Sequence, residues 1–227
     1  LVPAATIAAI TAELQAPFLN SFGSTETGLP PLSGHLLPIG DPLTNLAKRL
    51  SSGCELRLVD DAGRDVPDGE VGEAWVRGPT LFSGYWSRGG LDRSSFRDDW
   101  YAMGDLFKRT PDGGHHFVGR SKYLIKSGGE NIYPAEIEEF LYTNPKIAQV
   151  AVFGVPDDYY GEQLMAWVRP KIGEKISEEE IRAYCQDRIA HFKIPHYIWF
   201  VEEFPTTVTG KLQKFRMREM AIEKMKR

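Results

Sequence analysis

The segment from Gly119 to Glu138 combines backbone freedom with side chains able to do chemistry. Strand-forming residues run up to Ser127, two glycines follow, and Pro134 marks the start of a helix. Adjacent glycines allow backbone conformations that side chains forbid, and they let a ligand approach the main chain closely. Proline at the first helical position loses no hydrogen bond. The pattern predicts a strand, a bare glycine turn and a helix start beside a tightly fitted ligand.

Three other segments carry reactive groups in a fixed order around this turn. Two precede it, Asn20 to Glu26 (NSFGSTE) and Tyr101 to Asp105 (YAMGD), and Pro205 to Lys211 (PTTVTGK) follows it. In this order the four segments resemble the adenylate-forming enzymes, which include acyl- and aryl-CoA synthetases, luciferase and the adenylation domains of peptide synthetases. The resemblance runs from about residue 20 to the end of the chain. Alone, each motif would more often be an ordinary polar loop, but four in order are specific.

The resemblance implies a site for ATP or AMP. An ionised carboxylate accepts two hydrogen bonds at once, which suits a ribose diol, and Mg²⁺ is usually held by one or two carboxylates plus phosphate oxygens. The family commonly has tyrosine where Phe22 stands and threonine where Met103 stands. For Arg120 a structural ion pair is the alternative to a ribose contact. The implied contacts are Phe22 with adenine, Gly23 with ATP or AMP, Thr25 with phosphate, Glu26 with Mg²⁺, and Asp105 and Arg120 with ribose.

Lys211 is the expected catalytic residue. An ammonium between a carboxylate and the α-phosphate offsets their repulsion and stabilises the charge that develops at phosphorus, an effect that is often the largest catalytic term. We interpret Lys214 and Lys224, in the basic tail, as surface lysines. The family rotates its C-terminal domain between two half-reactions, which implies a hinge at Lys122. One face of this domain would present Lys211 for the first half-reaction. The other face would present the CoA side of the site, formed by Lys126, Ser127, Gly128 and Gly129.

Hydrophobic patterns predict the elements that position these segments. Residues 3–15 place Ile7, Ile10 and Leu14 at helical spacing. From Gly53 to about Arg120, short alternating stretches separated by turn signals predict an antiparallel β region. The expected strands and turns there are strands over 55–59, 71–77 and 115–118, with turns at 60–63 and 111–114.

After Arg120 the pattern predicts strand, helix, strand, strand, helix, strand and a helical basic tail from Leu212. A capping box of Ser177 and Glu180 opens the second helix, whose expected apolar face is Ile181, Tyr184 and Ile189. The first helix is expected over 134–142, and the later strands over 150–153, 164–168 and 198–201. The expected fold class is α/β and α+β. Residues 1–121 would be an antiparallel, β-barrel-like remnant of a large N-terminal domain, and residues 122–227 a small, mobile α+β C-terminal domain.

Composition excludes several classes of function. A net charge of −4 argues against a nucleic-acid partner, and no apolar run approaches the length of a transmembrane segment. Cys54 and Cys185 are expected as two reduced thiols, which indicates a cytoplasmic protein. The five histidines show no metal-ligand spacing, and neighbours in a strand such as His115 and His116 point to opposite faces.

The resemblance also shows what is missing, because no Ser/Thr/Gly-rich phosphate loop occurs in this sequence. We therefore expect the C-terminal portion of an ATP-dependent acyl-CoA synthetase, inactive without the missing N-terminal portion. The partners would be ATP, Mg²⁺, CoA and a carboxylic acid, whose pocket borders Thr27 to Pro31. The alternatives are a non-catalytic module that binds a nucleotide or a partner, and an adenylation domain that loads a carrier protein.

Overall fold

The structure is a computed structural model that describes residues 2 and 4–226. The chain divides into two compact units, Leu1–Lys122 and Tyr123–Arg227. Residues 2 and 4–226 include no helix with the length and hydrophobicity of a membrane-spanning segment.

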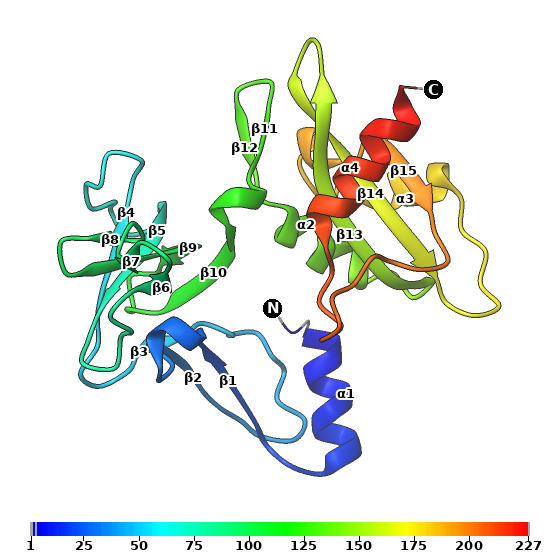
Figure 1. The fold of residues 1–227 in the computed structure, drawn as a ribbon. Helices are drawn as coiled ribbons and strands as arrows, with labels where there is room; N and C mark the ends of the chain where they lie inside the picture. The colour runs from blue at the N-terminus through cyan, green and yellow to red at the C-terminus, as the bar shows by residue number, and fades with distance from the viewer. Residues whose placement is uncertain (1, 3, 227) are drawn as a thin grey trace. The chain divides into compact units, whose positions relative to one another are not determined.

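The first unit is built mainly from antiparallel strands (Figure 1). One sheet has the order β1-β2-β3, a second has the order β10-β9-β5-β4 with β8 beside β9, and β6 and β7 form a separate hairpin. The elements are α1 (Ala4–Leu14), β1 (Phe18–Phe22), the 3₁₀ turn η1 (Thr25–Thr27), β2 (Leu32–Leu37), β3 (Arg49–Leu50), β4 (Glu55–Val59), β5 (Val71–Arg77), β6 (Tyr85–Ser87), β7 (Gly90–Asp92), β8 (Phe96–Arg97), β9 (Trp100–Arg109), β10 (His115–Arg120) and η2 (Ser121–Tyr123), which ends in the second unit.

The predicted strands and turns of this unit are confirmed. β4 and β5 have the expected bounds, the amide of Gly63 donates to Asp60 O at 2.9 Å, and Thr110 N donates to Gly114 O across the second turn. The apolar face predicted for α1 is wrong at one end. Ile7 is buried, but Leu14 is 68% exposed because it is the last helical residue and lies beyond the turn that packs inward.

The second unit contains a sheet of order β12-β11-β14-β13, and β15 pairs with β14 in parallel. Its elements are β11 (Ile125–Ser127), β12 (Glu130–Ile132), α2 (Pro134–Tyr142), β13 (Ile147–Asp157), β14 (Gly161–Pro170), α3 (Glu178–Cys185), the 3₁₀ turn η3 (His191–Lys193), β15 (Tyr197–Phe200) and α4 (Lys214–Met225).

Both faces of the sheet in the second unit are buried. Successive side chains of a strand point to opposite faces, so Val150 and Val152 pack in one core while Ala151 and Phe153 pack in another. α2 and α3 cover the first core, and α4, red and in front of β13 and β14 in Figure 1, covers the second. This double covering explains why β13 is an almost continuous apolar run.

The α+β order of this unit is confirmed, with two local corrections. The capping box is present, because Glu180 N donates to Ser177 Oγ at 3.2 Å and Ser177 N donates to Glu180 Oε2 at 2.8 Å. The face predicted for α3 is wrong at Ile189, which follows the end of the helix. The glycine turn does not lead directly into α2. It closes a hairpin, because β12 returns along β11 before the helix begins.

Candidate functional site

Asp105 and Arg120 form an ion pair at one end of the β9–β10 pair. The antiparallel register places the two residues opposite each other, and Arg120 Nε donates to Asp105 Oδ1 at 3.1 Å. The Asp105 side chain is 5% exposed, whereas that of Arg120 is 50% exposed. Strand register therefore brings together two residues that are fifteen positions apart in sequence. The pair leaves a buried carboxylate beside a partly exposed guanidinium.

Burial decides the protonation behaviour of Asp105. Removal from water raises the pKa of this carboxyl above its ordinary value, and the neighbouring positive charge of Arg120 only partly opposes that rise. The backbone around it is held by side chains, because Gly104 N donates to Glu73 Oε1 at 3.0 Å and Ser121 Oγ donates to Gly104 O at 3.2 Å. The backbone that carries the buried carboxylate is thus fixed by hydrogen bonds from both sides.

Phe22 packs against the inner surface of the same sheet. Its ring meets that of Phe107 edge-on with centroids 4.8 Å apart, and that of Phe117 at 5.6 Å. The ring is only partly buried, so part of it remains available to a ligand. Beside it lies a cavity of about 210 Å³. Asn20, Ser21, Phe22, Lys48 and Phe117 line this cavity together with Val2.

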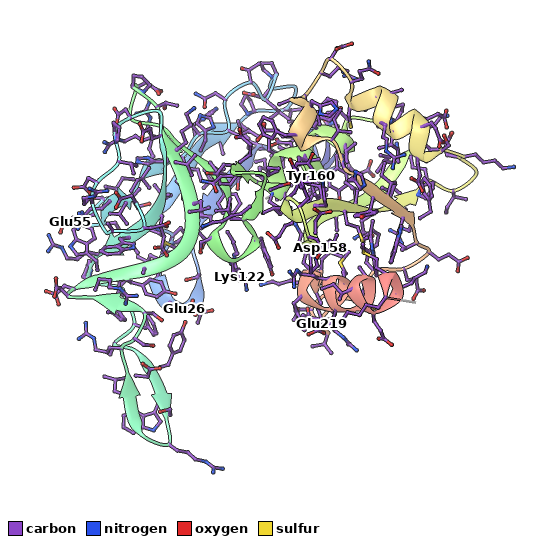
Figure 2. The ribbon with its side chains drawn as sticks, turned by 90° about the horizontal axis from the view of Figure 1, so that it is seen from above. Glu26, Glu55, Lys122, Asp158, Tyr160 and Glu219 are labelled. Carbon is purple, nitrogen blue, oxygen red and sulfur yellow. The ribbon has the colours of Figure 1, made fainter. Side chains whose placement is uncertain are left out.

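Glu26 lies in the short 3₁₀ turn that follows β1 and Gly23. Tyr85 Oη donates to Glu26 Oε1 at 2.8 Å, and Phe82 N donates to Glu26 O at 2.8 Å. Figure 2 labels Glu26 close to the base of the β6–β7 hairpin, from which Tyr85 comes. A single carboxylate with this support is a hard oxygen donor of the kind that Mg²⁺ accepts. The residues that the structure describes contain no group of three or more metal-binding side chains.

The glycine turn of the second unit is a two-residue hairpin loop. Gly128 and Gly129 have φ values of +58° and +87°, the left-handed region that this loop type requires at both positions. Gly128 N donates to Tyr160 O at 3.0 Å, and a Cβ added at Gly128 would lie 3.0 Å from Tyr160 Cδ1. Figure 2 labels Tyr160. Ser127 is buried in the hairpin, and the neighbouring Lys126 is exposed.

Lys211 lies in a loop that folds back on itself. Lys211 N donates to Thr207 Oγ1 at 3.1 Å, and Thr207 N donates to Lys211 O at 2.8 Å. The side chain of Lys211 is exposed, and the structure gives it no ion pair with any residue that it describes. In Figure 1 this loop, which precedes α4, and the tip of the β11–β12 hairpin lie at opposite ends of the second unit.

The predicted site residues thus form separate groups. In the first unit Arg120 is near enough to both Asp105 and Glu26 to act on them electrostatically, and Phe22 packs on the same strands. In the second unit Gly128 and Lys211 lie apart, and Lys122 is the last residue before that unit.

One prediction about the basic tail is wrong. Lys214 is not a surface lysine, because its side chain is only 14% exposed and its Nζ lies 2.6 Å from Glu138 Oε1. Lys224 is exposed and lies over the Trp199 ring, 4.6 Å from its centroid. The two cysteines are free thiols. No sequence pattern pointed to Lys48 or Tyr85, because their positions depend on contacts between distant segments.

Both units match families of known enzymes. Residues 2–86 match the family described as AMP-binding enzyme, and residues 136–211 match the family described as AMP-binding enzyme C-terminal domain. A curated relative, medium-chain acyl-CoA ligase ACSF2, mitochondrial, from Rattus norvegicus is 46% identical over 159 residues. This stretch covers 68% of the present chain and 25% of the relative, so the chain spans about a quarter of that protein's length.

Solved structures of similar proteins extend over nearly the whole chain. Anthranilate CoA ligase AuaEII in complex with anthranoyl-AMP has a TM-score of 0.87 and 32% identity, covering 99% of this chain and 44% of that one. O-succinylbenzoate coenzyme A synthetase (MenE) from Bacillus subtilis, in complex with ATP and magnesium ion, has a TM-score of 0.80 and 29% identity. That likeness covers 96% of this chain and 44% of the synthetase.

Proposed function

This chain belongs to the family of AMP-binding, adenylate-forming enzymes, and from that membership we propose that it forms part of an ATP-dependent acyl-CoA synthetase. In the first half-reaction a carboxylate oxygen attacks the α-phosphorus of ATP and pyrophosphate leaves. In the second, the sulfur of CoA attacks the acyl carbon and AMP leaves. The observation that carries the proposal is the high identity to an acyl-CoA ligase, together with matches to both family domains.

The first unit would bind the nucleotide. The Asp105 carboxylate accepts hydrogen bonds from the ribose diol, and Arg120 both holds that carboxylate and contacts the ribose. Phe22 borders the adenine, Gly23 contacts the nucleotide, and Thr25 contacts phosphate. Glu26 would hold Mg²⁺, which supplies charge neutralisation at the phosphates when bound. The hydrogen bond from Tyr85 supports this role, because it fixes the carboxylate in place.

The second unit would supply a different face to each half-reaction. Lys211, exposed on its tight loop, stabilises the charge that develops as the acid attacks the α-phosphate. Gly128 and Gly129, with Lys126 and Ser127 beside them, line the path of the CoA thiol. Because the two groups lie at opposite ends of one unit, we infer that residues 122–227 rotate about Lys122 between the steps.

The acid itself is proposed only as a class. Leu29, in the segment expected to border the acyl pocket, is 64% exposed and apolar, which fits a carboxylic acid with an apolar tail. Medium-chain fatty acids and aromatic acids are the first to test, because the names of similar proteins refer to them. The cytoplasmic location stays a prediction, and the word mitochondrial belongs to the name of the relative.

Lys211→Met tests this assignment in the longest natural form of the protein that contains this sequence. We expect pyrophosphate release from ATP and acid to fall by at least about a hundredfold, the usual scale for losing one preorganised charge-stabilising group. Thioester formation from supplied acyl-AMP and CoA should be retained. Equal loss of both half-reactions would contradict the two-face arrangement, and Lys224→Met is the matched control in the same basic tail.

Turnover also separates the alternatives. A non-catalytic nucleotide-binding module would bind AMP but release no pyrophosphate with any acid of a panel. An adenylation domain that loads a carrier protein would release pyrophosphate but form no product with free CoA.

A further inference from the structure

Lys48 is a buried lysine that has no carboxylate partner among residues 2 and 4–226. It is 4% exposed, and no ion pair joins its ammonium to any acid among the residues that the structure describes. Within the part of the chain that the structure describes, its Nζ donates only to Leu46 O, at 3.5 Å, which is the far limit of a hydrogen bond. Burying an ammonium without good partners is unfavourable by more than an exposed ion pair contributes. A ligand that offers a hydrogen-bond acceptor would offset this cost.

The backbone of Lys48 is firmly placed. Lys48 N donates to His115 O at 2.9 Å, and His115 N donates to Lys48 O at 2.8 Å, so an isolated bridge ties this residue to the first residue of β10. Burial lowers the pKa of the Lys48 ammonium from its ordinary value, as expected for a charge removed from water. The ammonium is therefore held in the wall of the unit, largely shielded from solvent.

Lys48 lines the cavity of about 210 Å³ beside Phe22. This volume is below the 300 to 1,000 Å³ that is typical for whole drug-sized ligands, so the cavity suits one ring system and not a complete nucleotide. Phe22 and Phe117 supply aromatic walls on which a base can stack. The Asn20 amide adds a donor and an acceptor, the pair that matches the N6 and N7 edge of adenine.

We propose that Lys48 is a base-contacting residue of the nucleotide site, whose ammonium donates a hydrogen bond to a ring nitrogen of the purine that lies on Phe22. This inference rests on the proposed function, because it assumes that Phe22 borders the adenine. A charge-assisted hydrogen bond to a neutral acceptor satisfies the buried ammonium that the unit otherwise leaves without a good partner. A phosphate is a poorer occupant, because the walls are aromatic and the expected phosphate contact is the exposed Thr25.

The test compares Lys48→Met with Lys108→Met, a matched control at an exposed position of β9. Pyrophosphate release by the longest natural form is measured with ATP and with its 1-deaza, 3-deaza and 7-deaza analogues. We expect Lys48→Met to raise the KM for ATP about tenfold to a hundredfold, the value of a hydrogen bond to a charged group. The KM for the acid should stay constant.

One deaza analogue should reproduce this rise in the unsubstituted protein, and Lys48→Met should add nothing further with that analogue. An unchanged KM for ATP in Lys48→Met would overturn the inference. So would a further rise in KM on top of the effect of each of the three analogues. So would a lower melting temperature of Lys48→Met with equal loss for every substrate, because Lys48 would then pair with another part of the protein.

Failure of the proposed function has a different signature. In that case the unsubstituted protein releases no pyrophosphate with any acid. The Kd for AMP is then measured by calorimetry on the same variants. A weaker Kd in Lys48→Met alone supports the base contact without the ligase activity. An equal Kd in all variants, or no binding of AMP, overturns it.

Discussion

Lys214 Nζ lies 2.6 Å from Glu138 Oε1, and this ion pair joins the first turn of α4 to the middle of α2. The side chains of the two residues are 14% and 17% exposed. Glu138 Oε1 also accepts a hydrogen bond from Val152 N at 2.6 Å, so the carboxylate holds two helices and β13 together. Lys211 precedes α4 by three residues. The ion pair between Lys214 and Glu138 therefore fixes one end of the loop that carries Lys211.

Lys214→Ala should destabilise the protein strongly. It leaves the largely buried Glu138 carboxylate without its cation, and breaking a buried pair costs about 3 kcal/mol or more. Urea denaturation followed by circular dichroism measures the change in the free energy of unfolding. Lys224→Ala, which removes only an exposed cation over Trp199, should cost less than about 1 kcal/mol. Equal losses in the two variants would show that the ion pair contributes no stability.

Asp105→Asn should weaken nucleotide binding without lowering stability. An amide cannot accept two hydrogen bonds in the way that a carboxylate does, so the Kd for AMP should rise about tenfold or more. The unfolding free energy at neutral pH should stay equal or increase, because burial makes the ionised Asp105 unfavourable in the fold despite Arg120. Calorimetry and urea denaturation measure the two quantities.

The same variant should change how stability depends on pH. The folded pKa of Asp105 is raised above its ordinary value of 3.8, so between these two values the folded state holds a proton that the unfolded state has lost. The contribution of Asp105 therefore makes the protein more stable as pH falls through the raised pKa, and this gain is complete below the ordinary value. The stability advantage of Asp105→Asn over the unsubstituted protein should shrink over that range. An advantage independent of pH would argue against a raised pKa.

Tyr85→Phe should reduce the apparent affinity for Mg²⁺ in pyrophosphate release. The change removes the hydroxyl that donates to Glu26 Oε1, and loss of such a supporting hydrogen bond typically weakens metal binding about tenfold. Titration of activity with Mg²⁺ at saturating ATP measures the effect. Trp86→Phe in the same hairpin is the control, because Trp86 is 83% exposed. If both variants respond alike to Mg²⁺, the Tyr85 hydroxyl does not support a metal site at Glu26.

Gly128→Ala should impair thioester formation more than adenylation. An alanine there takes a left-handed conformation, which costs about 1 kcal/mol, and its Cβ presses on the Tyr160 ring. Gly173→Ala has the same backbone cost at φ +82°, but no atom lies within 4 Å of its Cβ. We expect only the first variant to slow the reaction of supplied acyl-AMP with CoA. Similar rates in both would place the CoA path elsewhere.

Local chemistry makes much of the chain predictable from its sequence. The capping box of Ser177 and Glu180 depends on residues three positions apart, and it is present as expected. β4 and β5 follow their own hydrophobic patterns and the turns beside them. The four motifs also identify the family, because each is a short continuous stretch whose residue types are visible in the sequence. These features need no knowledge of distant contacts.

Tertiary structure decided every feature that depends on two distant segments. Strand register pairs Asp105 with Arg120, and close packing buries Lys214 against Glu138 and leaves Lys48 in a cavity wall. A lysine in a sequence carries no sign of whether its ammonium meets water, a carboxylate or a cavity. Only the folded chain sets the interatomic distances and the burial that distinguish these cases. The distances and the burial therefore give the lysines of this chain their different roles.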